Sequence, residues 1–401
     1  MAPAGTGGGA MSQAAGVVVV GGGVMGASIA YHLAGRGARD VVVVEKRFVA
    51  AGATGKSSAC VRQHYSTPET CRMALDSLRF FERSAEHLGG RETGFVRTGC
   101  LLVADARLQK EMAATVDLQH AVGIDTRVVS PGEAAAIEPR VRTDDVVTGC
   151  FEPASGYADP VATAQAFAGA ARDRGARILE DTEVVGLLVE GSRVRGVETS
   201  RGRLEAPVVV NAAGLWADRV AATAGVALPI TVCRHKISIV AWPAEARRPH
   251  PMVYDFATSI YTRPEAGGHI LVGPLDDETP DRADPDQYRE GVSFDESLEA
   301  LRRVGQRFPV LEHGAVARGY AGCFDVTPDW HPVIDQTGPD GLYTAAGFSG
   351  HGFKLSPAVG RMMARLVLDG RPPGDDVHAF RLSRFAEGQP IRGTYGDWLM
   401  C

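Results

Sequence analysis

A glycine-rich turn that follows a run of valines constrains the fold of this chain more than any other feature. Residues 16–20 read Gly-Val-Val-Val-Val, and an unbroken β-branched run is typical of a strand buried on both faces of a parallel sheet. Residues 21–26 read Gly-Gly-Gly-Val-Met-Gly and fit the pattern G-x-G-x-x-G. Helical composition over Ala27–Ala34 and a second buried strand over Asp40–Val44 complete the unit. The order strand, turn, helix, strand predicts a dinucleotide-binding βαβ unit.

Each glycine of this turn has its own physical role in such a unit. Gly21 allows the tight turn, Gly23 lets the backbone approach a pyrophosphate, and Gly26 lets the helix pack closely on the sheet. Val24 and Met25 stand at the entrance of the helix, where free N–H groups and a partial positive charge favour phosphates. The alternative is a glycine-rich turn that holds no ligand.

Glu45 stands directly after the second valine run. Its carboxylate would accept hydrogen bonds from ribose hydroxyls and would repel a 2′-phosphate, which disfavours NADP. Lys46 and Arg47 weaken this exclusion because they add positive charge beside it, and we include Lys46 among the expected cofactor contacts. The fingerprint alone does not choose between FAD and NAD.

The rest of the chain predicts an α/β core together with a second, antiparallel region. Helical patterns cover Pro160–Arg174, Glu296–Phe308 and Pro357–Leu368. Short apolar runs predict strands at Ala176–Leu179, Val184–Val189, Arg193–Thr199, Val208–Val210 and Leu342–Ala346. Pro229–Gly273 alternates apolar with polar residues, as antiparallel strands do, and Asp276–Gly291 has the polar, acidic composition of a surface loop.

Charge and cysteine content exclude other classes of protein. The 401 residues carry 42 basic and 48 acidic side chains, scattered rather than blocked, so we expect no nucleic-acid partner. Seven widely spaced cysteines without a C-x-x-C pair predict a reduced compartment and no metal site. Residues 1–15 lack Lys and Arg, which predicts a disordered leader rather than a signal peptide. Val17–Val20 is too short to span a membrane, and we expect a cytoplasmic protein.

Four later segments select the cofactor through their likeness to a known family. They are residues 52–65 (GATGKSSACVRQHY), 210–217 (VNAAGLWA), 322–332 (GCFDVTPDWHP) and 346–354 (AGFSGHGFK). With the glycine fingerprint before them, the chain resembles the glycine oxidase/D-amino acid oxidase superfamily of FAD enzymes, especially its sarcosine oxidase branch. Several matches in the same order are far more specific than one.

The resemblance implies an α/β fold in which a doubly wound, Rossmann-like FAD-binding domain carries an inserted domain. The antiparallel β-sheet of that inserted substrate domain would roof the flavin ring. We assign residues 16–88, 146–226 and 319–375 to the FAD-binding domain. Residues 89–145 and 227–318 are assigned to the substrate domain, and residues 376–401 to a C-terminal tail.

The resemblance also implies which residues contact FAD. Ser57 and Ser58 lie in a small-residue loop that could approach the flavin, although they could instead cap the helix that follows. The loop 347–352 could offer backbone N–H groups to a reduced flavin, with a plain turn as the alternative. Further contacts are expected at Val184, Ala213, Gly214, Trp216, Gly322, Gly347, Ser349, Gly350, His351, Gly352 and Phe353.

Arg62 and Lys354 match the two positions that hold the substrate carboxylate in sarcosine oxidase-like enzymes. Arginine offers a planar fork to a carboxylate and lysine adds a point charge, although each could instead pair with a surface acid. Tyr261 matches an active-site tyrosine above the flavin, with a place in the core as the alternative. His64 could face the flavin ring or have a structural role.

The chain departs from the family pattern in two informative places. Cys323 lies one residue beyond the position of the cysteine that attaches flavin in monomeric sarcosine oxidases, which is Gly322 here, so we expect non-covalent FAD. Those oxidases also carry a lysine that promotes reaction with O2 on the strand matching His269–Gly273, and this chain has none there. A dehydrogenase with another electron acceptor therefore stays open beside an oxidase.

We expect an enzyme that oxidises the C–N bond of a small amine or amino acid, such as a sarcosine-, glycine-, D-amino acid- or imino acid-like compound. Hydride would pass to flavin N5, and the imine would hydrolyse. Partner subunits or a homo-oligomer are compatible with the sequence. Three alternatives stay open: a 2-hydroxyacid dehydrogenase, an amine or imine oxidase acting on a larger biosynthetic metabolite, and the FAD subunit of a multi-subunit dehydrogenase.

Overall fold

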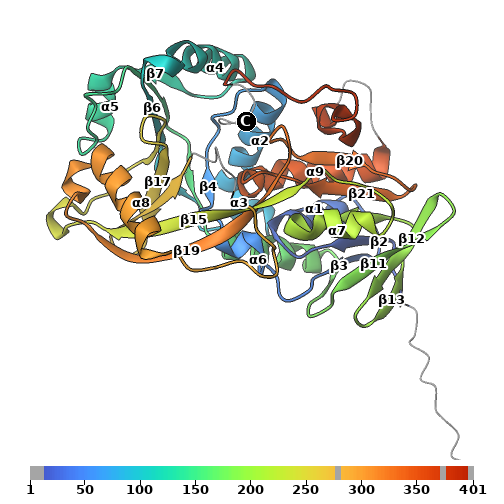
Figure 1. The fold of residues 1–401 in the computed structure, drawn as a ribbon. Helices are drawn as coiled ribbons and strands as arrows, with labels where there is room; N and C mark the ends of the chain where they lie inside the picture. The colour runs from blue at the N-terminus through green and yellow to red at the C-terminus, as the bar shows by residue number, and fades with distance from the viewer. Residues whose placement is uncertain (1–12, 276–280, 371–375, 396–401) are drawn as a thin grey trace, which may run out of the picture.

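The computed structural model describes residues 13–275, 281–370 and 376–395, and a six-stranded sheet forms the core of one half of the molecule, on the right in Figure 1. Its strand order is β10 (Arg177–Leu179), β3 (Val41–Val44), β2 (Val17–Val20), β14 (Val209–Asn211), β21 (Leu342–Ala346) and β20 (Val333–Gln336). The first five strands run parallel, and β20 is an antiparallel edge. All valines of β2 and β3 are buried, which confirms the prediction of two fully buried parallel strands.

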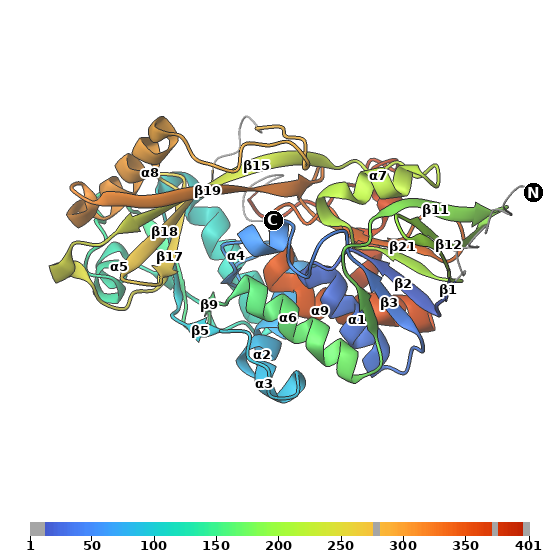
Figure 2. The ribbon, with the colours of Figure 1, turned by 90° about the horizontal axis from the view of Figure 1, so that it is seen from below.

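Both faces of this sheet are covered. Helices α1 (Val24–Gly35), α6 (Pro160–Asp173) and α9 (Gly352–Asp369) lie on one face (Figure 2). The other face is covered by α7 (Ala217–Ala222) and by a small sheet of β1 (Gln13–Ala14), β13 (Gly202–Glu205), β12 (Arg193–Thr199) and β11 (Val184–Glu190). Alternate valines of β2 enter separate cores, which is why the strand reads as a continuous apolar run.

A second, eight-stranded sheet completes the architecture. Its order is β19 (Ala315–Val326), β15 (Thr231–Ala241), β18 (His269–Pro274), β17 (Ile260–Glu265), β16 (Met252–Asp255), β6 (Cys100–Ala104), β8 (Thr148–Glu152) and β7 (Arg127–Val129). Its neighbours pair antiparallel except for β16 with β6. Helices α5 (Pro131–Ile137) and α8 (Phe294–Arg307) pack on the face that carries Leu101 and Val272, whereas Tyr254 and Tyr261 lie on the other face with α4 (Gln109–Val122).

Helix α2 (Pro68–Glu82) is the helix that was expected to follow Ser57 and Ser58, without predicted bounds, and its start carries a clear signal. Thr67 is the N-cap and accepts a hydrogen bond from the Thr70 N–H at 3.4 Å, and Pro68 occupies the first helical position. Helix α2 packs against α9 and continues into the short α3 (Ser84–His87). A three-stranded sheet, β4 (Cys60–Val61), β9 (Gly156–Tyr157) and β5 (Val96–Arg97), lies nearby.

Helix α9 starts five residues before the predicted Pro357 and includes that proline in its interior. Proline has no N–H to donate to the carbonyl group of Phe353, one turn earlier. The Ser356 hydroxyl donates to that carbonyl at 2.9 Å instead, so the polar group is satisfied and the helix continues. Lys354 therefore lies in the first turn of α9, next to the glycine-rich loop.

The structure differs from the predicted organisation of the chain in three places. Gln13–Ala14, assigned to a disordered leader, form β1 and pair in parallel with β13, while residues 1–12 lie outside the described ranges. Strand β8 and the part of β19 from residue 319 onward, both assigned to the FAD-binding domain, pair within the eight-stranded sheet. The expected C-terminal tail is packed over 376–395, where the fully buried Arg384 pairs with Asp329 at 2.7 Å.

No disulfide joins any of the described cysteines, and Cys401 lies outside the described residues. Among the helices of the described ranges, none combines the length and the apolar content needed to cross a membrane.

We expect the Gly26→Ala variant to be strongly destabilised. A Cβ at residue 26 would lie 1.9 Å from the carbonyl oxygen of Gly21, a backbone atom that cannot move without shifting the turn. The free energy of unfolding should fall by about 2–4 kcal/mol, measured by urea denaturation. Gly132→Ala is the matched control, because that helical glycine has no heavy atom within 4 Å of an added Cβ. Equal stability of both variants would contradict the direct contact of α1 with the turn.

Candidate functional site

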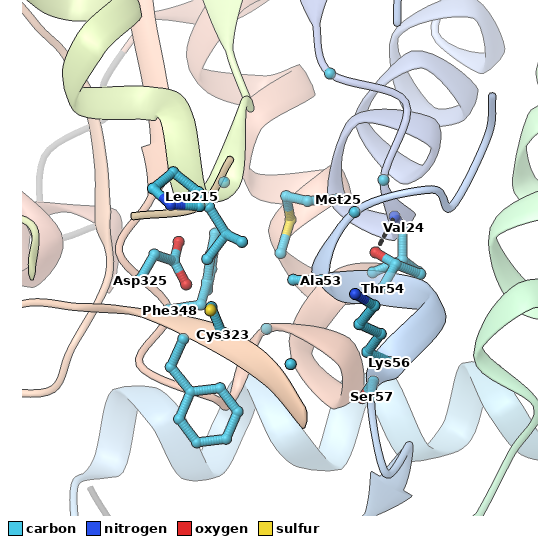
Figure 3. Close-up of a pocket in the computed structure, with 18 of the residues that line it drawn as sticks. Val24, Met25, Ala53, Thr54, Lys56, Ser57, Leu215, Cys323, Asp325 and Phe348 are labelled. Carbon is cyan, nitrogen blue, oxygen red and sulfur yellow. Dashed lines mark hydrogen bonds between the residues drawn. The ribbon is translucent and has the colours of Figure 1, made fainter. Parts of the chain in front are cut away.

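The candidate site is a cavity of about 740 Å³ that both large sheets help to line. The carboxyl ends of β2 and β3 and the turn after β14 form one wall, and side chains from β15, β16 and β17 form another. Met25, Thr54 and Lys56 lie across the cavity from Leu215, Cys323 and Asp325 (Figure 3). The volume lies within the usual range of cofactor and ligand sites, and the carboxyl edge of a parallel sheet is where open α/β folds bind ligands.

The glycine turn brings helix α1 against the end of β2. Gly21 has a φ of +104°, and a Cβ there would lie 2.5 Å from the carbonyl oxygen of Ala212 in the turn after β14. Gly26, in the first turn of α1, packs directly on the Gly21 carbonyl, so no side chain separates the helix from the end of β2. These contacts agree with the structural roles that the sequence assigned to both glycines.

The N-terminus of α1 opens into the cavity. Gly23, Val24 and Met25 all line it, and the Val24 N–H donates to the Thr54 hydroxyl at 3.0 Å (Figure 3). The positive end of the helix dipole therefore faces the cavity, where it would favour an anionic group such as a phosphate. Sequence reasoning missed Thr54 as a partner of this turn.

Glu45 is held at the end of β3 by two backbone groups. Its carboxylate accepts from the Gly22 N–H at 2.6 Å and from the Arg47 N–H at 2.8 Å. Lys46 also lines the cavity, but its ammonium pairs with Asp286 at 2.8 Å and with Glu183 at 3.5 Å. The positive charge beside Glu45 is thus partly neutralised, which strengthens the case against a 2′-phosphate.

Most of the residues predicted to contact the cofactor line this one cavity. They are Gly21, Gly23, Val24, Met25, Glu45, Lys46, Ser57, Ser58, Val184, Ala213, Gly214, Trp216, Gly322, Ser349, Gly350, His351, Gly352, Phe353 and Lys354. Gly26 and Gly347 are not among the lining residues; Gly347 instead lies against Thr327, whose side chain would be 2.4 Å from an added Cβ. Ser57 and Ser58 do not cap α2, because Thr67 does so.

The loop 347–352 is organised by Asp325 at the end of β19. Its carboxylate accepts from the Gly347 N–H at 2.7 Å, and its backbone carbonyl accepts from the Ser349 N–H at 3.0 Å. Burial raises the pKa of the Asp325 carboxyl to about 6, because the charged form loses its hydration. These two hydrogen bonds hold the loop at the cavity wall, where Asp325 and Phe348 lie close together (Figure 3).

Arg62 and Lys354 bring two buried positive charges to the same cavity. Their exposed fractions are 3% and 6%. Arg62 donates to the His64 carbonyl and stacks its guanidinium over the Tyr65 ring, while its Nε has no hydrogen-bond partner among the described residues. Within the same ranges, neither cation has a carboxylate at ion-pairing distance.

The pKa of Lys354 is lowered to about 7, first by burial and then by repulsion from Arg62. A bound anion between the two cations would stabilise the ammonium and raise this pKa again. Buried Glu152 acts on Arg62 only through its charge, without an ion pair, and burying cations that lack an ion-pair partner is costly. The pair therefore favours an anionic ligand such as a carboxylate.

Aromatic rings from the eight-stranded sheet line the cavity beside these cations. Tyr261 stacks on Tyr254 with ring centroids 5.4 Å apart, and its hydroxyl lies 3.1 Å from Nε2 of His235. His235 stacks in turn on Phe324 at 4.2 Å. Burial raises the pKa of the Tyr261 phenol and lowers that of His235 to about 3, so both rings are neutral. Tyr261 lines the cavity, as do Tyr254, His235 and Phe324, which sequence reasoning missed.

His64 does not line the cavity, so its prediction as a catalytic residue is wrong. Its ring is fully buried and contacts the Tyr395 hydroxyl at 2.8 Å and the Gln119 amide at 3.1 Å. Burial and the Arg62 charge lower its pKa to about 3. The structural alternative therefore holds: His64 fixes the backbone whose carbonyl receives Arg62.

Comparisons with known proteins agree with this geometry. A family model described as FAD dependent oxidoreductase (DAO) matches residues 16–366. The crystal structure of L-proline dehydrogenase from P. horikoshii has a TM-score of 0.87 and 31% identity, covering 95% of this chain and 100% of that one. Sarcosine oxidase subunit beta of Rhodobacter capsulatus is 28% identical, over 94% of this chain and 89% of its own. Mitochondrial sarcosine dehydrogenase of Homo sapiens is 30% identical over 94% of this chain but only 42% of its own, so the chain spans less than half of that relative.

We expect a small carboxylate to bind more weakly as the pH rises above 7. Only the protonated form of Lys354 attracts it, and the lowered pKa of about 7 means that the ligand-free protein loses this proton early. Affinity should be constant below pH 7 and fall by up to about tenfold per pH unit above it, until the raised pKa of the complex is reached. Calorimetric titration of the cofactor-loaded protein with propionate between pH 6 and 9 measures this.

The Lys354→Met variant is the control for this titration. This variant should bind propionate weakly, and its affinity should not change between pH 6 and 9, because the titrating amine is gone. A wild-type Kd that stays constant from pH 6 to 9 would remove Lys354 from the anion site.

Proposed function

Because this chain belongs to the DAO family of FAD-dependent oxidoreductases, we propose that it oxidises the C–N bond of a small amine or amino acid that carries a carboxylate. One observation carries the proposal: a single cavity joins the dinucleotide turn to two buried cations that have no carboxylate at ion-pairing distance among the described residues. The relatives named for sarcosine and proline support a secondary amino acid as the substrate class.

The residues of the cavity fit FAD. The glycine turn and the N-terminus of α1 would hold the pyrophosphate, since a Cβ at Gly21 or Gly26 would meet backbone atoms there. Glu45 would hold the ribose, and the turn 212–216 with the loop 347–352 would contact the ring system. When bound, FAD supplies the two-electron acceptor for the substrate hydride.

The protein's own residues orient the substrate. Arg62 and Lys354 would bind its carboxylate, which leaves the amine and its adjacent C–H toward the aromatic rings of Tyr254 and Tyr261. The substrate would lose a hydride from carbon and a proton from nitrogen. Water would hydrolyse the resulting imine in a later, separate step. The buried rings exclude water while the hydride is transferred.

The electron acceptor is proposed to be either O2 or another redox partner. Strand β18 carries no lysine, and Lys56 in the cavity is paired with Glu290. Neither position therefore offers an unpaired ammonium that could stabilise superoxide as it forms from O2. This favours a dehydrogenase over an oxidase. Partner subunits are proposed from the likeness to a sarcosine oxidase β subunit, and a cytoplasmic location and non-covalent FAD remain proposals as well.

Removing either cation should strongly lower kcat/KM for carboxylate substrates. Arg62→Ala and Lys354→Met each remove a charged partner from a buried site, so kcat/KM should fall roughly 30- to 1000-fold. Anaerobic bleaching of the flavin absorbance by sarcosine and by L-proline measures the reaction without assuming an acceptor. Lys236→Met is the matched control, because this lysine of β15 does not line the cavity.

The same assay tests the substrate class. Dimethylamine, which has the secondary amine of sarcosine without its carboxylate, should reduce the flavin far more slowly than sarcosine in the wild type. In Arg62→Ala and Lys354→Met, the ratio of the flavin reduction rates with sarcosine and with dimethylamine should be smaller than in wild type. Bleaching by lactate but by none of the amines would replace the proposal with a 2-hydroxyacid dehydrogenase.

A further inference from the structure

Residues 281–291, which we call the strap, precede α8 and run along the edge of the cavity. Pro285, Asp286, Tyr288 and Glu290 of the strap line the same cavity as the glycine turn. In chain order the strap lies between strands of the eight-stranded sheet, yet its middle contacts Lys46, which follows β3, and Trp216 and Arg219, which follow β14 of the six-stranded sheet. It therefore bridges the two regions on which the cofactor site depends.

A single buried arginine holds both ends of the strap. Arg234 of β15 has a side chain only 4% exposed. Its Nε donates to the Arg289 carbonyl at 2.8 Å and its Nη2 to the Gly291 carbonyl at 2.6 Å. At the other end, its backbone N–H donates to the Asp281 carbonyl at 2.7 Å. Both ends of the strap are thus fixed to β15, which belongs to the cavity wall formed by the eight-stranded sheet. The middle of the strap spans the distance between these two attachment points.

The middle of the strap is tied to the opposite side through Asp286. Its carboxylate accepts from Lys46 at 2.8 Å, from the Trp216 indole N–H at 3.1 Å and from Arg219 at 2.7 Å. Arg219 also pairs with Asp284 at 2.9 Å. These donors come from three places around the site: the end of β3, the turn η3 (Gly214–Trp216) and helix α7.

A second tie lies further along the strap. Lys56, on the short helix η1 (Ala53–Lys56), donates to the Tyr288 hydroxyl at 2.5 Å and pairs with Glu290. An isolated surface ion pair contributes little to stability, but several donors on one carboxylate form a network. The Asp286 side chain is 38% exposed, so added salt can weaken this network.

We propose that the strap is a clasp that retains the bound dinucleotide, and that Asp286 is its latch. The ion pairs of Asp286 and Asp284 keep the strap closed along the cavity, so FAD leaves the protein when they open. The proposal rests on FAD occupying this cavity and does not depend on which substrate is oxidised. Its failure would therefore leave the amine proposal standing, and the reverse also holds.

The rate of FAD release from the holoenzyme tests the clasp. The holoenzymes of wild type and Asp286→Asn are mixed with excess apo-glucose oxidase, which binds FAD, and the capture of released FAD is followed by the return of glucose oxidase activity. Release should be about tenfold faster in D286N, because three ties of the network lose their charged acceptor. Raising NaCl from 0.05 to 0.5 M should speed release from wild type more than from D286N.

Two control variants separate the latch from general effects. Gln287→Ala changes the next strap residue, whose side chain has no partner in the described ranges and does not line the cavity. Asp295→Asn removes one exposed negative charge on α8, outside the strap. Both should release FAD at the wild-type rate.

A release rate in D286N equal to or slower than that of wild type would overturn the proposal. Slower release would mean that Lys46 and Arg219, once freed, bind the cofactor phosphates themselves. Asp284→Asn provides a second variant should D286N fail to fold, with an expected increase in release rate of a few-fold.

Discussion

The direct contact between helix α1 and the end of strand β2 is the constraint on which the rest of the site depends. Gly26 meets the Gly21 carbonyl with no side chain between them, and Gly21 in turn meets the carbonyl of Ala212. This contact aims the positive end of α1 into the cavity and sets the turn after β14 beside it. Glu45 and the loop 347–352 complete the edge because parallel strands end on the same side of a sheet.

Charge balance distinguishes the substrate end of the cavity from the rest of the protein. The other deeply buried arginines have acidic partners: Arg307 pairs with Asp255 and Arg384 with Asp329, each at 2.7 Å. Arg62 and Lys354 have no such partner within the described ranges, although both are buried. A protein that neutralises its buried cations elsewhere and leaves two together in a cavity has a site suited to an anion.

Segments far from the glycine turn hold this site from outside. Through Asp286, the strap links the eight-stranded sheet to Lys46 at the end of β3. The C-terminal segment places the Tyr395 hydroxyl on the buried ring of His64. His64 then presents its carbonyl to Arg62. Both segments had been expected to be peripheral, yet each supports a residue that lines the cavity.

The sequence by itself determined the βαβ unit, the glycine turn and the carboxylate after β3, because these features depend on short-range periodicity and on residues that follow one another. Resemblance added Arg62, Lys354 and Tyr261. Only the tertiary structure decided that His64 turns away from the cavity, that Lys46 pairs with Asp286, and that Pro357 lies inside a helix. These outcomes depend on partners brought together by folding, in the case of Lys46 and Asp286 from positions 240 residues apart, and no local pattern encodes such a partner.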